Sequence, residues 1–272
     1  MRNMSESVIT LNGIKKSYGK HKVLEDVSLQ VNKGDIYGLV GKNGAGKTTI
    51  FKVILGLSDY NGGKLVIDGG SDVQGIKDGR KKIGFFVGSN FFPYMTARQN
   101  LEYYRTLKNI SDKKEVDRVL GIVELDKVKS PYRNFSLGMR QRLGIANAIM
   151  GSPEILILDE PTNGLDPQGI ADVRHLIQKL NSEYDMTVIV SSHILGELQN
   201  TAHRFGIVNN GRIVKEISTN DLATDEQAVR ICVDNLEKAE AALNAAGVKI
   251  ISKIHETKTL EEYYFNLVGG KE

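Results

Sequence analysis

A glycine-rich octapeptide at residues 41–48, Gly-Lys-Asn-Gly-Ala-Gly-Lys-Thr, constrains this chain more than any other feature. An apolar run at residues 36–40 precedes it, and a helical pattern over residues 49–57 follows it. In such a turn, successive backbone N–H groups can point at an anion, and the helix N-terminus adds partial positive charge. A chance Gly-rich turn explains this context poorly. The residues expected to line a nucleoside triphosphate are Gly41, Lys42, Asn43, Gly44, Ala45, Gly46, Lys47, Thr48 and Thr49.

Two side chains of this loop have more specific expected roles. Lys47 can reach the β- and γ-phosphates of the nucleotide, because it follows the last glycine of the loop. The hydroxyl group of Thr48 can ligate Mg²⁺. The loop therefore predicts both a nucleotide and a metal ion.

The composition is that of an ordinary soluble protein, with 272 residues of which 40% are hydrophobic and 25% are charged. The net charge of +3, from 36 basic and 33 acidic residues, is too small to indicate a nucleic-acid partner. No apolar stretch approaches the ~18 residues that cross a bilayer, and the polar start lacks the apolar segment of a signal peptide. We therefore expect a cytosolic protein of one large or two modest domains, without a nucleic-acid partner.

Hydrophobic patterns divide most of the chain into strands and helices. Residues 96–150 show helical spacing, which predicts a helical insertion, and Ser111 or Asp112 starts one of its helices. Asp166-Pro167 opens a further amphipathic helix over residues 168–182. Strand and helix alternate around that helix, which predicts a parallel α/β sheet. Strands are predicted over residues 8–11, 24–31, 35–40, 64–67, 82–87, 155–158 and 187–190.

A hairpin and a small appendage complete the pattern. Residues 205–209 and 212–217 flank Asn210-Gly211, a strong hairpin turn. The character of the sequence changes after residue 223, and we place a domain boundary near residue 225. Strand, helix, strand and helix are predicted beyond it, over residues 229–233, 237–246, 248–254 and 260–267.

Two carboxylates and a histidine follow the buried strands of this sheet. Asp159 and Glu160 come directly after the apolar run 155–158, and His193 follows the next strand. Open α/β sheets bind ligands at the carboxyl ends of their strands. We expect Asp159 to hold Mg²⁺, directly or through water, and Glu160 to orient or deprotonate the attacking water. His193, on a neighbouring parallel strand, would contact the γ-phosphate and help to position the water. The alternative is an acidic pair that merely ends a strand, with an ordinary histidine nearby.

The segment Phe-Ser-Leu-Gly-Met-Arg-Gln-Arg at residues 135–142 has two interpretations. Ser136 can cap the helix that continues through Ala148. Alternatively, its hydroxyl group, the N–H of Gly138 and the helix N-terminus can form a second phosphate contact. Because the chain already has one phosphate-binding loop, this surface could serve ATP that another copy holds.

Together these motifs resemble those of the nucleotide-binding subunit of ATP-binding cassette (ABC) transporters, over about residues 5–220. As an isolated residue, Tyr18 would be an exposed turn aromatic, but in the family this position stacks on adenine. The ordered set of motifs makes the resemblance specific. The matching segments are Tyr18, 41–49 (Walker A), 135–139 (the position of the Leu-Ser-Gly-Gly-Gln signature), 155–160 (Walker B), 163–166 (the D-loop) and His193 (the switch histidine).

The resemblance implies an α/β fold of the P-loop NTPase type. It would have a parallel core sheet, an N-terminal antiparallel β-subdomain and an inserted α-helical subdomain at about residues 88–150. The ABC ATPase domain would span residues 5–224. Residues 225–272 would form a small α+β C-terminal appendage.

The resemblance also implies an ATPase that uses ATP and Mg²⁺ and pairs head to tail with a second ATPase subunit, here in a homodimer. Asp166 would communicate across the interface, and a separate transmembrane permease would hold the pair at the inner face of the cell membrane. Closure of the dimer by ATP, and its opening by hydrolysis, would power export. The residues that would contact the other copy's ATP are Ser136, Leu137, Gly138 and Met139.

The signature segment departs from the family pattern at two positions. Leu137 replaces the usual Gly, and Met139 replaces the usual Gln. Ser136 and Gly138 are retained, so the phosphate contact should survive. This form of the signature is similar to that of bacitracin- and lantibiotic-type exporters, as is the C-terminal ending of the chain. An antimicrobial peptide or another hydrophobic compound is therefore the expected substrate.

A second departure concerns the glutamine of the family's Q-loop. Counting from the preceding strand places Gly88 at this position, and counting back from Pro93 places Val87 there. Ser89 or Asn90 could supply the missing oxygen. The link between Mg²⁺ and the permease would then be altered, while hydrolysis could persist.

Other functions compete with an export ATPase. A soluble cassette ATPase of translation or DNA repair usually joins two cassettes or carries a long coiled coil, and this sequence shows neither. A P-loop kinase or GTPase would leave residues 135–142 and 163–166 unexplained, and the Asn-Lys-x-Asp segment that reads guanine is missing. A nucleotide-gated module with negligible turnover would fit the altered Q-loop.

Overall fold

The computed structural model describes residues 6–88, 91–219, 233 and 235–248. The chain forms two compact units, Met1–Leu222 and Ala223–Glu272. In the second unit the structure describes helix α9 (Leu236–Ala245), close to the helix predicted over residues 237–246. The predicted boundary near residue 225 lies outside the described residues and stays a prediction. The other elements predicted for the appendage, over residues 229–233, 248–254 and 260–267, also lie largely outside them.

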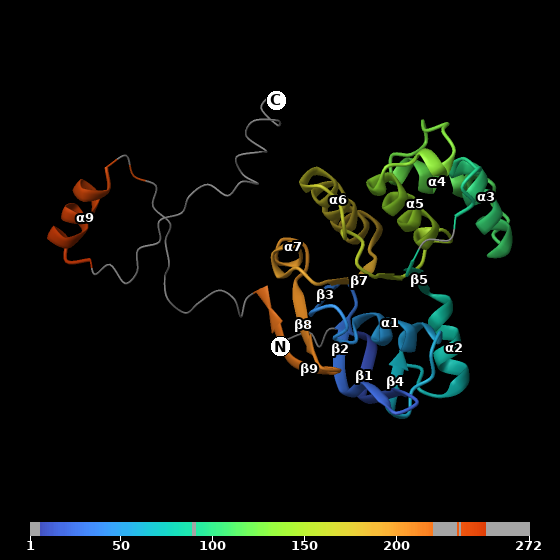
Figure 1. The fold of residues 1–272 in the computed structure, drawn as a ribbon, viewed down its shortest axis with the longest axis horizontal. Helices are drawn as coiled ribbons and strands as arrows, with labels where there is room; N and C mark the ends of the chain where they lie inside the picture. The colour runs from blue at the N-terminus through green and yellow to red at the C-terminus, as the bar shows by residue number, and fades with distance from the viewer. Residues whose placement is uncertain (1–5, 89–90, 220–232, 234, 249–272) are drawn as a thin grey trace. The chain divides into compact units, whose positions relative to one another are not determined.

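A mixed sheet organises the first unit, in the order β4-β1-β2-β9-β8-β3-β7-β6-β5 (Figure 1). Antiparallel pairing joins β1 to β2 and β4, and β8 to β9, whereas β8, β3, β7, β6 and β5 are parallel neighbours. The predicted parallel core with antiparallel N-terminal strands is therefore confirmed. The strands are β1 (Ser7–Tyr18), β2 (His21–Asn32), β3 (Ile36–Val40), β4 (Gly62–Ile67), β5 (Ile83–Phe86), β6 (Ile155–Leu158), β7 (Thr187–Ser192), β8 (Arg204–Asn209) and β9 (Arg212–Ser218).

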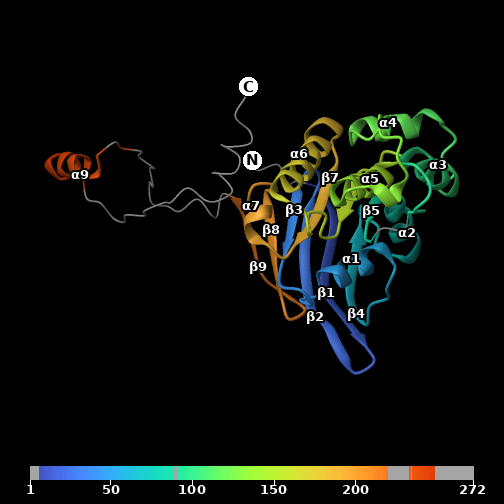
Figure 2. The ribbon, with the colours of Figure 1, turned by 45° about the horizontal axis from the view of Figure 1, so that its top comes forward.

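The predicted helical insertion corresponds to α3, α4 and α5, which are grouped together, away from the antiparallel strands β1, β2 and β4 (Figure 2). Asp112 accepts the N–H of Lys114 at 2.9 Å where α4 begins, in line with the predicted helix start. Among the described residues, no helix is both long and apolar enough to cross a membrane. The helices of the first unit are α1 (Lys47–Leu55), α2 (Val73–Lys81), α3 (Ala97–Leu107), α4 (Lys114–Ile122), a short 3₁₀ helix (Tyr132–Asn134), α5 (Leu137–Ile149), α6 (Pro167–Tyr184) and α7 (Leu195–Gln199).

The sequence patterns did not predict α2 and α7. Two glycines, Gly75 and Gly79, interrupt the short pattern of α2, and glycine disfavours helix. The structure needs both for packing, because a Cβ at Gly79 would lie 2.6 Å from Cγ2 of Ile67 and a Cβ at Gly75 would lie 2.8 Å from Cα of Gly70. The other helix, α7, has only five residues, too few to show a helical period.

The parallel strands are covered on both faces. Leu156 and Leu158 of β6 belong to the core cluster that includes α5 and α6, whereas Ile155 and Ile157 belong to the cluster that includes α1 and the antiparallel strands. Successive strand side chains point to opposite faces, so apolar side chains are needed on both. The unbroken apolar runs predicted this arrangement. It places the carboxyl ends of β3, β6 and β7 at one edge of the sheet.

A buried carboxylate in the helical insertion gives a testable pH dependence. Glu115 of α4 is buried, and it accepts hydrogen bonds from the Arg118 guanidinium (2.7 and 2.6 Å) and from the backbone N–H of Gly151 (2.7 Å). Burial opposes the charged form, but Arg118 and the Gly151 N–H outweigh it and hold the pKa of Glu115 below its ordinary value.

We expect Glu115→Gln to lower the free energy of unfolding by about 1–3 kcal/mol at pH 7, because it weakens hydrogen bonds to a charged group. The loss should shrink as the pH falls through about 4.3, because the unfolded carboxylate then binds a proton before the folded one does. Urea unfolding of both proteins between pH 3 and pH 7 measures this, with Asp126→Asn as an exposed control. Parallel pH profiles for wild type and Glu115→Gln would contradict it.

Candidate nucleotide-binding site

The loop between β3 and α1 has the backbone conformation that its glycines allow. Gly44 and Gly46 have φ angles of 81° and 114°, a region that other residues rarely adopt. Gly46 is the N-cap of α1, and no described side chain caps this helix. The first N–H groups of α1 are thus left for a ligand. Gly41 is also required for packing, because a Cβ there would lie 2.4 Å from the carbonyl oxygen of Val208.

Lys47 is buried inside the loop. Its Nζ donates to the carbonyl oxygens of Gly41 (2.5 Å) and Lys42 (3.3 Å) and lies 3.1 Å from Oε1 of Glu160. Only 5% of the Lys47 side chain is exposed. A buried ammonium group is tolerated here because carbonyl groups and a carboxylate surround it. The same amine can bind phosphate oxygens in their place.

The predicted metal ligands meet at the edge of the sheet. Thr48 Oγ1 donates to Asp159 Oδ2 at 2.7 Å, so the hydroxyl group and the carboxylate converge on one point. Both are oxygen ligands of the kind that Mg²⁺ prefers, and the two residues therefore fit this ion. Ser191, which the sequence reasoning did not assign, donates to Asp159 Oδ1 at 2.7 Å and accepts the N–H of Glu160 at 2.9 Å.

Glu160 and His193 are also in contact. Parallel pairing of β6 with β7 brings their ends together, and His193 Nδ1 lies 2.7 Å from Glu160 Oε2. Glu160 has a φ angle of 51°, which is strained for a residue other than glycine. The Glu160 carboxylate is thus held between Lys47 and His193. The sequence alone could not reveal the contact with His193, because the two residues are 33 positions apart.

Three other predicted residues lie elsewhere on the unit. Tyr18 ends β1, is 49% exposed, and shares a hydrogen bond of 3.1 Å with Ser58. The Ser136 side chain caps α5 by accepting the N–H of Met139 at 3.3 Å, as predicted. Asp166 caps α6, accepting the N–H of Gly169 at 2.9 Å.

The unusual signature residue Leu137 is accommodated by the D-loop. It is 44% exposed, and a Cβ at Gly164 would lie 3.1 Å from its Cδ2 atom. Gly164 has a φ angle of 77°, so an alanine there would be strained as well as crowded. The large residue in the signature is therefore matched by a glycine in the neighbouring loop.

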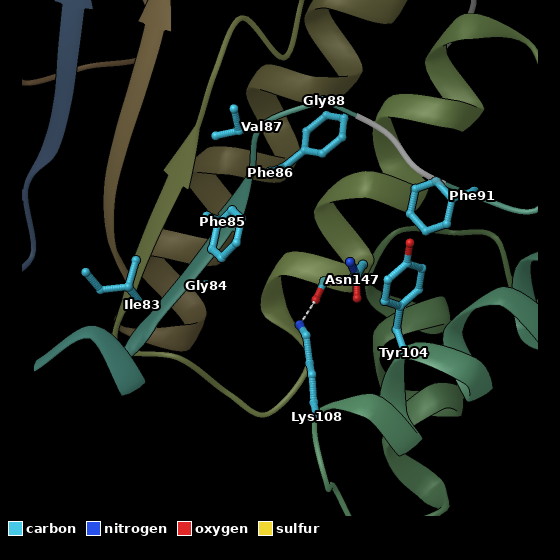
Figure 3. A pocket seen from close by; sticks show the side chains of 10 residues that line it. All are labelled: Ile83, Gly84, Phe85, Phe86, Val87, Gly88, Phe91, Tyr104, Lys108 and Asn147. Atoms are coloured by element: carbon cyan, nitrogen blue, oxygen red, sulfur yellow. Dashed lines mark hydrogen bonds between the residues drawn. The ribbon is translucent and has the colours of Figure 1, made fainter. Parts of the chain in front are cut away.

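The Q-loop position borders a pocket of about 320 Å³ (Figure 3). Val87 and Gly88, the two predicted positions, carry no side-chain oxygen, and Ser89 and Asn90 lie outside the described residues. Lys108 Nζ donates to the carbonyl oxygen of Asn147, and partial burial lowers the pKa of Lys108 to about 8. The lining residues are Ile83, Gly84, Phe85, Phe86, Val87, Gly88, Phe91, Tyr104, Lys108 and Asn147.

The aromatic residues beside this pocket divide into two groups. Phe91 packs against the rings of Tyr104 and Tyr132, with centroids 5.5 and 5.3 Å apart, and belongs with the core. Phe92 and Tyr103 are both at least 40% exposed and pack edge to face at 4.8 Å. These two rings are therefore accessible at the surface.

The family model described as "ABC transporter" matches residues 24–163. The chain belongs to the ABC transporter ATPases. The cassette is 40% identical to the bacitracin transport ATP-binding protein BcrA of Enterococcus faecalis, over 97% of each chain. It is 38% identical to the lantibiotic transport ATP-binding protein SrtF of Streptococcus pyogenes, over 77% of this chain and 90% of that protein.

Solved structures agree with the observed fold of the cassette. The dimeric structure of the bacterial ABC transporter cassette MJ0796 superposes with a TM-score of 0.69 at 27% identity, covering 78% of this chain and 98% of that one. The same protein in a post-hydrolysis state, bound to ADP and phosphate, gives the same values. This relative therefore forms a dimer and binds the products of ATP hydrolysis.

Proposed function

We propose that this cassette binds Mg²⁺-ATP between two copies of itself and uses ATP hydrolysis to drive export through a separate transmembrane permease. The observation that carries the proposal is the convergence of Lys47, Glu160 and His193 at the edge of the sheet, beside the Thr48–Asp159 pair. Lys47 can bind a terminal phosphate, Glu160 can act on water, and the Thr48–Asp159 pair can hold a metal ion.

The phosphate loop would bind the triphosphate through its N–H groups and Lys47. On ATP binding, we expect the Lys47 amine to exchange the carbonyl oxygens of Gly41 and Lys42 for phosphate oxygens. Mg²⁺, held by Thr48 and Asp159, would neutralise charge on the β- and γ-phosphates. Ser191 keeps the Asp159 carboxylate oriented through its 2.7 Å hydrogen bond. Tyr18, exposed at the end of β1, is available to stack on the adenine ring.

Glu160 would act on the attacking water. Its carboxylate can accept a proton from the water or orient it toward the γ-phosphate. His193, at 2.7 Å, holds that carboxylate and would contact the γ-phosphate.

The second copy would complete each site. Ser136, Leu137, Gly138 and Met139 lie at the N-terminus of α5, where exposed N–H groups and a serine hydroxyl suit a phosphate. In a head-to-tail dimer they would contact the ATP of the other copy, and Asp166 would lie at the interface. The dimeric cassette structure at 27% identity supports this assembly.

The permease would dock beside the pocket at β5, α3 and α5, at the inner face of the cell membrane. The exposed aromatic residues Phe92 and Tyr103 support an interaction surface there. Relatives named for bacitracin and lantibiotic transport favour an antimicrobial peptide as the exported compound. Without a glutamine at Val87 or Gly88, permease docking would act on the ATP site by another route.

The test is co-purification of the tagged cassette from detergent-solubilised membranes. We expect one polytopic membrane protein to co-purify, and to raise phosphate release by the cassette several-fold. Hydrolysis that is absent both with and without this membrane protein would favour a nucleotide-gated module. Co-purification with ribosomes instead would favour a soluble cassette ATPase and overturn the proposed export.

A further inference from the structure

One carboxylate oxygen joins two loops of the site. Oε2 of Glu197, in α7, accepts hydrogen bonds from Thr162 Oγ1 at 2.7 Å and from Ser192 Oγ at 3.1 Å. The three residues, which we call the Glu197 bridge, come from three different segments. None of the motifs that identify the cassette includes Glu197.

Each partner in the bridge is next to a residue of the site. Thr162 lies in the turn that leads from Glu160 to Asp166. Hydrogen bonds from Asn163 N to Glu160 O and from Leu165 N to Thr162 O close this turn. This turn runs into the D-loop (residues 163–166), which faces the second copy in the proposed dimer. A displacement of the D-loop therefore moves the Thr162 hydroxyl group.

Ser192 is the residue directly before His193. It is 1% exposed, and its hydroxyl group also accepts the N–H of Ile194 at 3.0 Å, which fixes the chain on both sides of His193. The orientation of the imidazole therefore depends on where Ser192 is held. The only carboxylate that holds it in the described part of the chain is that of Glu197.

The helix that carries Glu197 is firmly anchored. Thr201 Oγ1 donates to the Glu197 carbonyl oxygen at 3.0 Å, and Leu198 is 3% exposed. A Cβ at Gly38 of β3 would lie 3.2 Å from Cδ1 of Leu198, so α7 packs directly on the central strand. The backbone of Glu197 is thus anchored, and its side chain connects the two loops.

We propose that Glu197 is a positioning residue that couples the D-loop to His193, so that docking of the second copy is transmitted to the imidazole. The inference rests on the proposed head-to-tail dimer and on Glu160 as the catalytic group. Docking moves the D-loop, the Thr162 hydroxyl group transmits the shift to the carboxylate, and the carboxylate transmits it to Ser192. Small displacements of this kind have large effects on rate.

The test is steady-state ATP hydrolysis by Glu197→Ala and Glu197→Gln. Glu197→Ala should lower kcat by about tenfold to a hundredfold and leave the KM for ATP within about twofold, because alignment is lost while binding is retained. Glu197→Gln should recover most of the rate, since its amide oxygen still accepts both hydroxyl groups. Thr162→Val combined with Glu197→Ala should cost little more than Glu197→Ala alone, as expected for one connected unit.

Thr201→Val is the matched control, because it loosens the same helix without touching the carboxylate. A loss of kcat in Thr201→Val as large as in Glu197→Ala, fully additive effects of Thr162→Val and Glu197→Ala, or an unchanged kcat in Glu197→Ala would overturn the proposal. Glu160→Gln, assayed in parallel, separates a failure of the Glu197 bridge from a failure of the proposed function. If Glu160→Gln is inactive while Glu197→Ala is unaffected, the proposed function stands and the bridge has no role.

Discussion

Glu160→Gln is expected to abolish turnover while ATP stays bound. Glutamine keeps the shape of the side chain and its contact with His193, but it cannot accept a proton from water. The rate should fall by about 10²–10⁴-fold, the range typical for loss of a general base. ATP affinity should be retained or improved, because Lys47 loses a competing anionic partner 3.1 Å away. Phosphate release, together with light scattering to detect an ATP-driven dimer, measures both effects.

Glu154→Gln is the control for that substitution. Glu154 precedes the same strand, β6, at its opposite end, where it is exposed and pairs with Lys82. Its loss should leave turnover unchanged, since exposed ion pairs contribute little. Hydrolysis by Glu160→Gln at the wild-type rate would remove Glu160 as the catalytic group.

Two impaired variants are expected to restore activity when they are mixed. Lys47→Ala should weaken ATP binding by about 10- to 100-fold, because it removes a charge-assisted hydrogen bond of about 1.5–3 kcal/mol. Ser136→Arg should leave ATP binding by its own copy intact but block the surface that completes the partner's site. Neither variant alone can form a complete site.

A mixed dimer of these two variants contains one complete site. The intact Lys47 of the Ser136→Arg copy then faces the intact Ser136 of the Lys47→Ala copy. Random pairing makes half of the dimers mixed, so roughly a quarter of the wild-type turnover is expected from a closed two-fold assembly with independent sites. Full turnover by Ser136→Arg alone would show that each site is complete within one chain.

Most of the fold could be predicted because its signals are local. The apolar run 155–158 and the Asn210-Gly211 turn each define an element through neighbouring residues, and both elements are observed where they were predicted. α2 was missed because two glycines required for close packing, Gly75 against Gly70 and Gly79 against Ile67, obscure its helical period. The signature helix α5 begins where its serine cap predicts.

The candidate site could be predicted only in part. Lys47, Thr48, Asp159 and Glu160 follow from motifs, because phosphate and metal chemistry restricts residue types at short spacing. No sequence motif identifies Glu197, because its two hydrogen-bond partners are separated from each other by 30 positions along the chain. Only the parallel pairing of β6 with β7 brings those partners within reach of one carboxylate.

The sequence by itself predicted the nucleotide-binding loop, the acidic pair and the parallel core, because each depends on adjacent residues or on strand and helix periods. Membership of the ABC cassette group followed from the resemblance of its ordered motifs to those of the family. The tertiary structure alone decided which groups meet. It holds Lys47 against Glu160, places Ser191 behind Asp159, and packs Leu137 over Gly164. These contacts join residues far apart in the chain, and the distances between such residues are set by the order of strands in the sheet and by close packing of its two faces.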